Sequence, residues 1–282
     1  MARVLRTMDR QTIKWRGHRI NIGTTGQGEP LMLITGLGGS THMWRPLLKY
    51  FANRKIICFD APGTGESSTS MYPVPVSTLA HLAATVLESL DVQRADVLGY
   101  SYGGAIAQQM AFETPERIRR LVLAATSCGI GGVPGSAEAM SVLSNTLRYH
   151  SPAYFHRTAA VTYGGRTGRN AAVREQMMLT RHRHPPSSYG YSMQLMGAVG
   201  WSSLSFLAEI PHETLGISGD DDPLIPVENP QLLADCIPRA KLEIVERAGH
   251  LFLWDDPEHL AERIGAFVNA PHVAARPIQA SA

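Results

Sequence analysis

Short apolar runs and longer amphipathic segments alternate along most of the chain. The short runs are rich in Ile, Val, Leu and Phe and are bounded by Gly, Pro or Asp, which is typical of buried strands. Longer segments with helical spacing lie between or after them. The predicted strands are 31–34, 55–59, 96–98, 120–124, 214–217 and 242–245, and the predicted helices include 75–90, 105–113, 229–236 and 257–268. Strands that are apolar throughout and alternate with helices predict an α/β fold, with a mostly parallel sheet covered on both faces.

One long segment, 126–206, interrupts this alternation. It holds clusters of Met, Tyr, His and Arg and glycine-rich pieces such as GIGGVPGS and YGGRTGRN, but no convincing strand. An insertion of this length between two sheet strands is more consistent with a helical cap than with a loop. We therefore predict a core over 1–125 and 207–270, a helical cap over 126–206 and a flexible tail over 271–282.

Composition and charge exclude several classes of protein. The 282 residues are 44% hydrophobic and 18% charged, which is ordinary for a folded chain, and the formal net charge is only +2. Without a long Lys/Arg block, nucleic-acid binding has no electrostatic support. The first residues, MARVLRTMDRQTIKW, lack the apolar run of a signal peptide, and no apolar stretch is long enough to cross a membrane.

The cysteines point to the same kind of protein. Cys58, Cys128 and Cys236 are far apart, odd in number and without metal-type spacing. This favours reduced thiols in a cytoplasmic protein over a disulfide framework or a metal site.

The stretch VLGYSYGGAIAQ places glycines at the junction of a buried strand and an Ala-rich helix. Residues 99–103 fit G-x-S-x-G, the nucleophile elbow, in which a sharp turn lifts the serine hydroxyl above the sheet. The following helix contributes free N–H groups and a positive dipole end where an anion would form. In this context we interpret Ser101 as a nucleophile rather than as part of a plain tight turn.

A serine nucleophile needs a base, and the base needs an orienting acid, which on this kind of sheet follow in the order Ser, acid, His. The segments ISGDDDPLIP and ERAGHLFLWDDPE each follow a predicted strand and supply both groups. His250 is the predicted base. Asp222 is the favoured acid, while Asp220 or Asp221 could instead stabilise the turn.

The oxyanion of an acyl-transfer reaction needs two backbone donors. The amide of Tyr102 follows the nucleophile directly, and the loop TGLGGS offers the amide of Leu37. A phosphate-binding role for this loop is disfavoured because it lacks G-x-G-x-x-G and the Walker lysine.

Three other segments invite a chemical interpretation. RHRH, residues 181–184, contains His-x-His, but with no partnering acid or cysteine motif nearby a solvated cap segment is favoured over a metal site. The Met- and Tyr-rich piece 189–196 fits either cap core or an acyl pocket. FDAPGTGESS, residues 59–68, is interpreted as a structural loop.

With these residues in view, the chain resembles the α/β-hydrolases over 30–268, and within them the intracellular medium-chain-length polyhydroxyalkanoate depolymerases of bacteria. The closer resemblance rests on GGAIAQQMA, PERIRRLVLAAT, YGG, GDDDPLIP and GHLFL. It implies a triad of Ser101, Asp222 and His250. The chain departs from that family where Thr35-Gly36 replaces His-Gly in the oxyanion loop and where Tyr102 replaces Trp after the nucleophile.

The expectation is therefore a serine hydrolase of carboxylic esters that needs no metal or organic cofactor. The resemblance implies medium-chain poly(3-hydroxyalkanoate) or its oligomers as substrate, with a polyester granule surface as a potential partner. A small-molecule carboxylesterase or lactonase with the same residues is the main alternative, and perhydrolysis or C–C bond hydrolysis are weaker ones. A non-catalytic binding protein would have little reason to keep Ser, Asp and His in this order.

Overall fold

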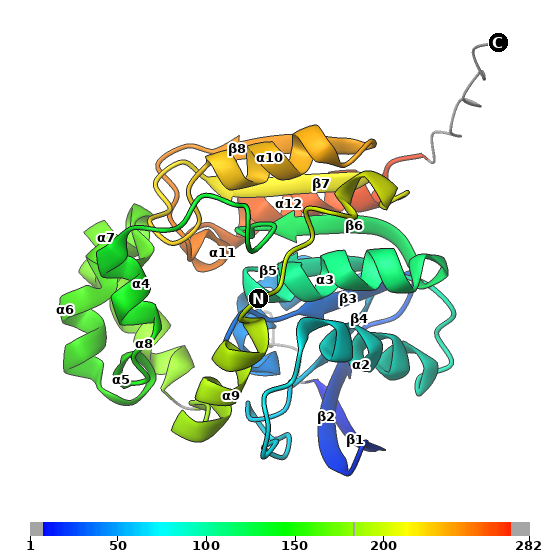
Figure 1. Cartoon of the computed structure of the whole chain (residues 1–282), viewed down its shortest axis with the longest axis horizontal. Coiled ribbons are helices and arrows are strands. Elements are labelled where there is room, and N and C mark those ends of the chain that lie inside the picture. Colours follow the sequence, from blue (N-terminus) through cyan, green and yellow to red (C-terminus); the bar gives the residue numbers. More distant parts are fainter. Residues whose placement is uncertain (1–7, 183, 272–282) are drawn as a thin grey trace, which may run out of the picture.

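An eight-stranded mixed sheet forms the centre of the computed structural model, which describes residues 8–182 and 184–271. The strand order is β1-β2-β4-β3-β5-β6-β7-β8, and β3 to β8 run parallel (Figure 1). The strands are β1 (Asp9–Trp15), β2 (His18–Thr25), β3 (Pro30–Ile34), β4 (Lys55–Phe59), β5 (Ala95–Tyr100), β6 (Ile118–Ala124), β7 (Thr214–Gly219) and β8 (Ala240–Val245). All six strands expected from the apolar runs are present, and the predicted α/β fold is confirmed.

The hairpin of β1 and β2 was not predicted. Its two-residue turn, Arg16 and Gly17, has positive φ at both positions (46° and 80°), as tight hairpin turns require. β1 is exposed along most of its length, so it carries no apolar run to detect. β2 pairs antiparallel with β4, which makes the sheet mixed. The local feature that could have indicated the hairpin is Gly17, which lies between two segments that each mix polar and apolar residues.

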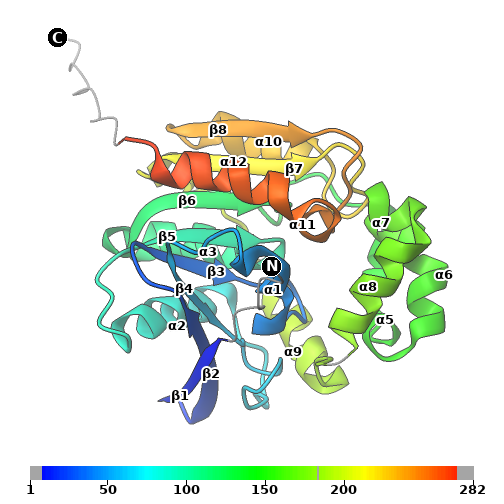
Figure 2. The ribbon, with the colours of Figure 1, turned by 180° about the vertical axis from the view of Figure 1, so that it is seen from behind.

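Helices cover both faces of the sheet (Figures 1 and 2). The core helices are α1 (Arg45–Leu48), α2 (Val76–Glu88), α3 (Tyr102–Glu113), α10 (Glu228–Cys236), α11 (Phe252–Asp255) and α12 (Pro257–Asn269), with short 3₁₀ helices η1 (Thr41–Trp44), η2 (Pro115–Arg117) and η3 (Leu207–Glu209). An apolar core lies on each face of the sheet, and alternate residues of β3 point into one core or the other. Leu31 and Leu33 pack with α1 and α12, whereas Met32 and Ile34 pack with α2, α3 and α10. This two-sided burial explains why the parallel strands are apolar throughout.

Six further helices lie between β6 and β7. They are α4 (Ala137–Leu143), α5 (Leu147–His150), α6 (Pro152–Tyr163), α7 (Gly165–Arg169), α8 (Ala171–Arg181) and α9 (Ser188–Ala198). Helices α4 to α8 gather on one side of the core, and α9 lies nearer to β2 (Figures 1 and 2). These helices fall inside the predicted cap, whose limits of 126–206 remain a prediction. The predicted tail over 271–282 lies outside the described residues, apart from Pro271.

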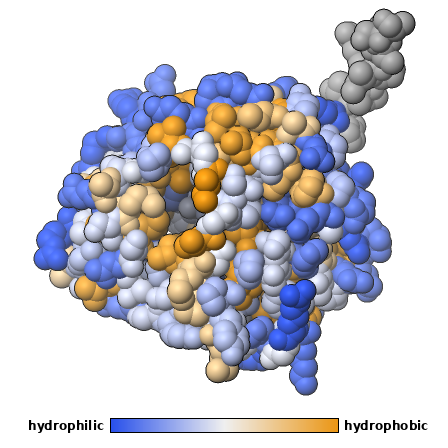
Figure 3. Space-filling model, viewed as in Figure 1, coloured by the Kyte–Doolittle hydropathy of each residue, from blue (hydrophilic) through white to orange (hydrophobic). Residues whose placement is uncertain are grey.

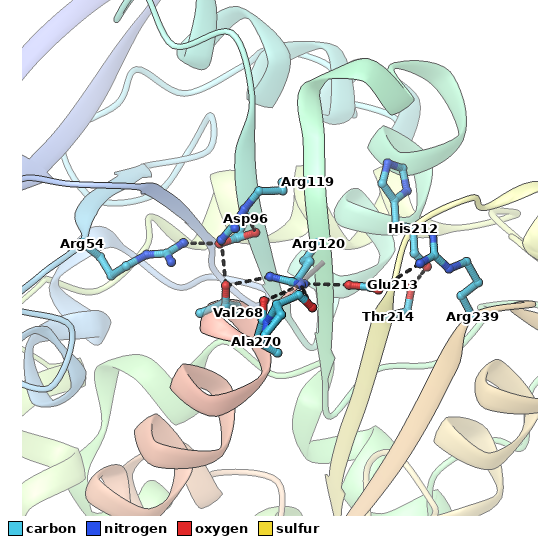
Figure 4. A network of polar contacts seen from close by, with 11 residues as sticks. Arg54, Asp96, Arg119, Arg120, His212, Glu213, Thr214, Arg239, Val268 and Ala270 are labelled. Atoms are coloured by element: carbon cyan, nitrogen blue, oxygen red, sulfur yellow. Dashed lines mark hydrogen bonds and ion pairs between the residues drawn. The ribbon is translucent and has the colours of Figure 1, made fainter. Parts of the chain in front are cut away.

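A buried ion-pair network ties the last helix to the sheet (Figure 4). Asp96, at the start of β5, is fully buried and pairs with Arg54 and Arg119. Arg119 and Arg120 also donate to the carbonyl of Val268 near the end of α12, at 2.8 and 3.0 Å. Cations are favourable at a helix C-terminus. Since Asp96 is the second residue of β5 and Ser101 follows the opposite end of that strand, these charges stabilise the fold and lie away from Ser101.

The Asp96 network gives a stability test. Asp96→Asn leaves Arg54 buried without its counter-charge, so the free energy of unfolding should fall by about 3–5 kcal/mol in urea titrations. The control is Glu243→Gln, which breaks a partly exposed ion pair with Arg263 and should change that free energy by less than about 1 kcal/mol. Equal losses in the two variants would contradict a dominant role for Asp96.

Among the described helices, none is both long and apolar enough to cross a bilayer.

Candidate active site

Ser101 occupies a strained turn between β5 and α3. Its φ of 54° and ψ of −121° are unfavourable for a residue with a side chain. The turn is possible because its neighbours lack side chains. A Cβ on Gly99 would lie 2.4 Å from the carbonyl oxygen of Gly103, and a Cβ on Gly103 would lie 2.2 Å from that of Ile34. The glycines of G-x-S-x-G are thus required by close backbone packing.

The structure brings the three predicted site residues together. The Oγ of Ser101 lies 3.0 Å from Nε2 of His250, and Nδ1 of His250 lies 2.8 Å from Oδ2 of Asp222. The other carboxylate oxygen of Asp222 accepts the backbone N–H groups of Leu224 and Ile225, at 2.9 and 3.0 Å. Because the carboxylate is fixed, it holds the imidazole with Nδ1 protonated and with the Nε2 lone pair facing the serine hydroxyl.

The three adjacent aspartates have different environments. Asp222 is buried against His250, whereas Asp220 and Asp221 are exposed. The carboxylate of Asp221 accepts the N–H of Gly165 at 2.9 Å and pairs with Arg169 at 2.5 Å, so it contacts α7 of the inserted helices. The geometry therefore favours Asp222 as the partner of the histidine and gives Asp221 a structural contact.

The backbone of His250 is held from two sides. Its N–H donates to the carbonyl of Tyr163 at the end of α6 (2.7 Å), and its carbonyl accepts the hydroxyl of Tyr100 (2.6 Å). Burial raises the pKa of Tyr100 well above its usual range, which keeps this hydroxyl protonated and able to donate. The inserted helices therefore help to position the histidine. No pattern in the sequence indicated the contact with Tyr163.

The residues that carry the two predicted oxyanion donors adjoin the site: Tyr102 follows Ser101 in the chain, and Leu37 lines the same cavity as Ser101. The N–H of Tyr102 is at the first position of α3, where the helix itself provides no acceptor. In the neighbouring loop the N–H of Gly38 already donates to Gln194 at 3.0 Å, and the carbonyl of Leu37 accepts the hydroxyl of Tyr149 at 2.7 Å. Both contacts fix the peptide unit between Leu37 and Gly38. The preceding peptide, which carries the Leu37 N–H, is held through the carbonyl of Gly36, which accepts the N–H of Gly39 at 2.9 Å. The Leu37 N–H stays the predicted second donor.

A cavity of about 60 Å³ opens onto Ser101 and His250. Small-molecule sites usually enclose about 300–1,000 Å³, so a medium-length acyl chain requires movement of the surrounding side chains or helices. From the inserted segment the cavity is lined by Leu143, Arg148, Tyr149, Tyr163, Arg181 and His184.

The segment RHRH, predicted to be a solvated part of the cap, is at least partly solvent-exposed at its described residues, and Arg183 lies outside the described residues. Two of its residues also have a contact that the sequence did not predict. Arg181 and His184 line the cavity, and the ring of His184 stacks on His42 of η1 with centroids 3.6 Å apart. Linear spacing gave no sign of this contact, because it depends on where α8 ends above the core. Within 8–182 and 184–271, no group of three or more His, Cys, Asp or Glu could hold a metal ion.

Part of the piece 189–196 packs against the inserted helices, while Tyr189 and Met196 at its ends are exposed. Tyr191 is fully buried and donates to the carbonyl of Leu143, and Met193 is buried as well. None of its residues is among those that line the cavity. Cap core is therefore the better of the two interpretations for this piece.

A family model for the alpha/beta hydrolase fold matches residues 29–257. The chain belongs to the α/β-hydrolase fold family. The matched residues of this α/β-hydrolase include β3 to β8, the turn at Ser101 and the inserted helices. The fold and the family expected from the sequence are confirmed.

Known relatives span most of the chain. A poly(3-hydroxyalkanoate) depolymerase of Ectopseudomonas oleovorans is 38% identical over 240 residues, covering 85% of this chain and 84% of the relative. A 2-hydroxymuconate semialdehyde hydrolase of Pseudomonas sp. strain CF600 is 30% identical over 276 residues, covering 92% and 93%. The crystal structure of a hydrolase from Pseudomonas aeruginosa superposes with a TM-score of 0.79 at 24% identity, over 93% of this chain and 99% of that one.

The contact of His42 with His184 gives a pH test. Burial, then the positive charges of His184, Arg10 and Arg45, lower the pKa of His42 from 6.5 to about 4. Protons therefore bind the unfolded chain first, and stability present above about pH 6.5 should be lost as the pH falls towards 4. His42→Gln should reduce this loss in urea titrations at about pH 7.5 and about pH 5.

The exposed histidine His81 gives the matched control, since His81→Gln should keep the pH dependence of the unmodified chain. Identical pH dependence in the His42 variant and the unmodified chain would show that the histidine pair does not titrate as described.

Proposed function

We propose that this α/β-hydrolase is a serine hydrolase that cleaves carboxylic ester bonds through an acyl-enzyme. Ser101 is the nucleophile, His250 the base and Asp222 the acid that orients it. The observation that carries this proposal is the pair of hydrogen bonds that link Ser101 to His250 at 3.0 Å and His250 to Asp222 at 2.8 Å. Both lie within the range over which a positioned base acts.

In the proposed reaction His250 carries out each proton transfer. Nε2 of His250 takes the proton of the Ser101 hydroxyl as Oγ attacks the ester carbonyl, and the N–H groups of Leu37 and Tyr102 stabilise the oxyanion. The imidazolium then protonates the departing alcohol, leaving an acyl group on Ser101. Water attacks this acyl-enzyme with His250 again as the base, and the acid is released. These reaction steps involve no change of oxidation state, and the chain's own residues supply every proton transfer.

For the substrate we propose medium-chain poly(3-hydroxyalkanoate) or its oligomers. The 38% identity to a poly(3-hydroxyalkanoate) depolymerase over most of both chains supports this choice. The largely apolar side chains that line the cavity with Ser101, among them Leu143, Leu224 and Trp254, suit an alkyl side group.

The surface offers a way to reach such a substrate. Apolar residues gather in the middle of the face shown in Figure 3, with hydrophilic residues around most of its edge. Exposed apolar side chains between β6 and β7 include Ile130, Val133 and Leu204. Apolar surface of this kind could contact a polyester granule, and this partner is part of the proposal.

Two other enzyme activities would use the same residues. A small-ester hydrolase or lactonase differs only in the shape of the acyl and alcohol sites. The 30% identity to a 2-hydroxymuconate semialdehyde hydrolase keeps C–C bond hydrolysis as a weaker alternative. The hydrogen-bonded Ser–His–Asp arrangement gives a non-catalytic binding protein little support.

Two substrates distinguish these possibilities: an amorphous suspension of medium-chain polyhydroxyalkanoate and a series of soluble nitrophenyl esters. We expect the unmodified enzyme to release 3-hydroxy acids from the polymer and Ser101→Ala to release none above background. Cleavage of the soluble esters with the polymer untouched would keep the mechanism and reject the polymer as substrate. Activity on neither, from folded protein, would contradict the proposal.

The choice among the aspartates has its own test. Asp222→Asn should lower kcat on a nitrophenyl ester by about 10⁴-fold, because the amide no longer holds the imidazole in the required tautomer. The control is Asp220→Asn, an exposed neighbour, which should keep the activity within about threefold. A large loss of activity in Asp220→Asn, together with an active Asp222→Asn variant, would show that Asp222 is not the acid that orients the histidine.

A further inference from the structure

Two arginines from the inserted helices line the same cavity as Ser101 and His250. Arg148 lies on the short helix α5 and is buried, with 3% of its surface exposed. Arg181 is the last residue of α8 and is partly buried. Positive charge is unusual in a cavity meant for neutral esters, because burial penalises an ion that has no counter-charge.

Within the described part of the chain, no carboxylate compensates these cations. Neither Asp nor Glu lines the cavity, and neither arginine forms an ion pair with a described residue. The two terminal nitrogens of Arg148 donate instead to the hydroxyls of Tyr163 and Tyr191, each at 2.8 Å. The Nε atoms of Arg148 and Arg181 are buried and without a hydrogen-bond partner in the described part of the chain. The structure therefore holds two guanidinium groups with donor capacity left over.

Both charges lie against the ring of Tyr149. The ring of Tyr149 has the guanidinium carbon of Arg148 at 4.5 Å from its centre and that of Arg181 at 4.4 Å. Burial by itself would raise the pKa of the Tyr163 hydroxyl, yet the two guanidinium groups lower that pKa below its ordinary value. The positive potential at this end of the cavity thus outweighs the effect of burial.

An anion is the natural ligand for such an arrangement. Arginine binds carboxylates through paired N–H groups, and tyrosine rings and hydroxyls hold the guanidinium groups in place before the ligand arrives. The hydroxyls of Tyr163 and Tyr191 keep Arg148 fixed, so little side-chain freedom is lost on binding.

We propose that Arg148 and Arg181 form a subsite for a substrate carboxylate, so that the enzyme acts on esters that carry a free carboxylate. This inference rests on the proposed ester hydrolysis and narrows its substrate to the carboxyl end of a 3-hydroxyalkanoate chain. In such a chain the alcohol released by cleavage of the last ester is itself a 3-hydroxy acid, whose carboxylate would occupy the subsite. The chain would then be shortened from its carboxyl end.

A matched pair of substrates tests the subsite. One is a 3-hydroxyoctanoate dimer with a free terminal carboxylate, and the other is the methyl ester of the same dimer, in which the internal ester is unchanged. The unmodified enzyme should cleave the internal ester of the free acid with a kcat/KM at least about tenfold higher than for the methyl ester. Arg181→Met should lower kcat/KM for the free acid by about 30-fold or more and lower that for the methyl ester by a much smaller factor, so that the preference for the free acid is lost.

Two further variants control for charge and folding. Arg157→Met removes an exposed arginine of α6 that does not line the cavity, and it should leave the preference for the free acid unchanged. Arg148→Lys keeps the charge but loses the paired donors, and should lower kcat/KM for the free acid more than for the methyl ester. Each variant is compared with the unmodified enzyme by circular dichroism and thermal unfolding.

The inference does not depend on the variants alone. On the unmodified enzyme, 3-hydroxyoctanoate should compete with a nitrophenyl ester at lower concentration than its methyl ester does. Equal inhibition, or equal kcat/KM for the two dimers, would overturn the carboxylate subsite while leaving ester hydrolysis intact.

Failure of the proposed function has a different signature, in which neither dimer nor any nitrophenyl ester is cleaved in a manner that depends on Ser101. In that event binding of 3-hydroxyoctanoate, followed by the intrinsic tryptophan fluorescence to which Trp254 in the cavity contributes, still decides the subsite. Saturable binding that Arg181→Met weakens would support it, and its absence would overturn it.

Discussion

The backbone turn at Ser101 is the constraint on which the rest of the site depends. A residue with a side chain is held at positive φ because Gly99 and Gly103 let the strand, the helix and the neighbouring loop approach within van der Waals distance. This strain is maintained by the surrounding sheet, whose two apolar cores fix β5 from both faces. The hydroxyl therefore lies at the carboxyl end of the sheet. The strands β7 and β8 end at the same edge, and the loops that follow them supply Asp222 and His250.

The inserted helices complete the site rather than merely cover it. The end of α6 accepts the backbone N–H of His250, and α7 contacts the aspartate next to Asp222. The same helices bring Tyr149 and the two arginines to the cavity. A change in the position of these helices would thus alter both the histidine and the chemistry of the cavity wall. This coupling is a physical reason for substrate specificity and catalytic geometry to vary together in such a fold.

Much of the fold could be predicted from local sequence patterns. The apolar strands, the glycines at 99 and 103 and the order Ser, Asp, His are all visible without knowledge of the tertiary structure. The hairpin of β1 and β2 was not predicted, because the edge strand β1 is mostly exposed and its sequence therefore contains no run of apolar residues. Among the three aspartates, local sequence favoured Asp222 without excluding the others, since only packing decides which carboxylate is buried. The position of Arg181 and His184 at the cavity was not predicted for the same reason. Their role depends on tertiary placement, which spacing within RHRH does not encode.

The most direct test of the central claim, that Ser101 is an activated nucleophile, is covalent labelling with an organophosphonate followed by intact-protein and peptide mass measurement. The account predicts one phosphonyl group per chain, located on Ser101, and no adduct in Ser101→Ala protein that folds normally. Its formation should slow strongly when His250 is replaced by Gln, because the serine then lacks a base. Folded protein that takes up no label, or a label that persists in Ser101→Ala, would contradict the account.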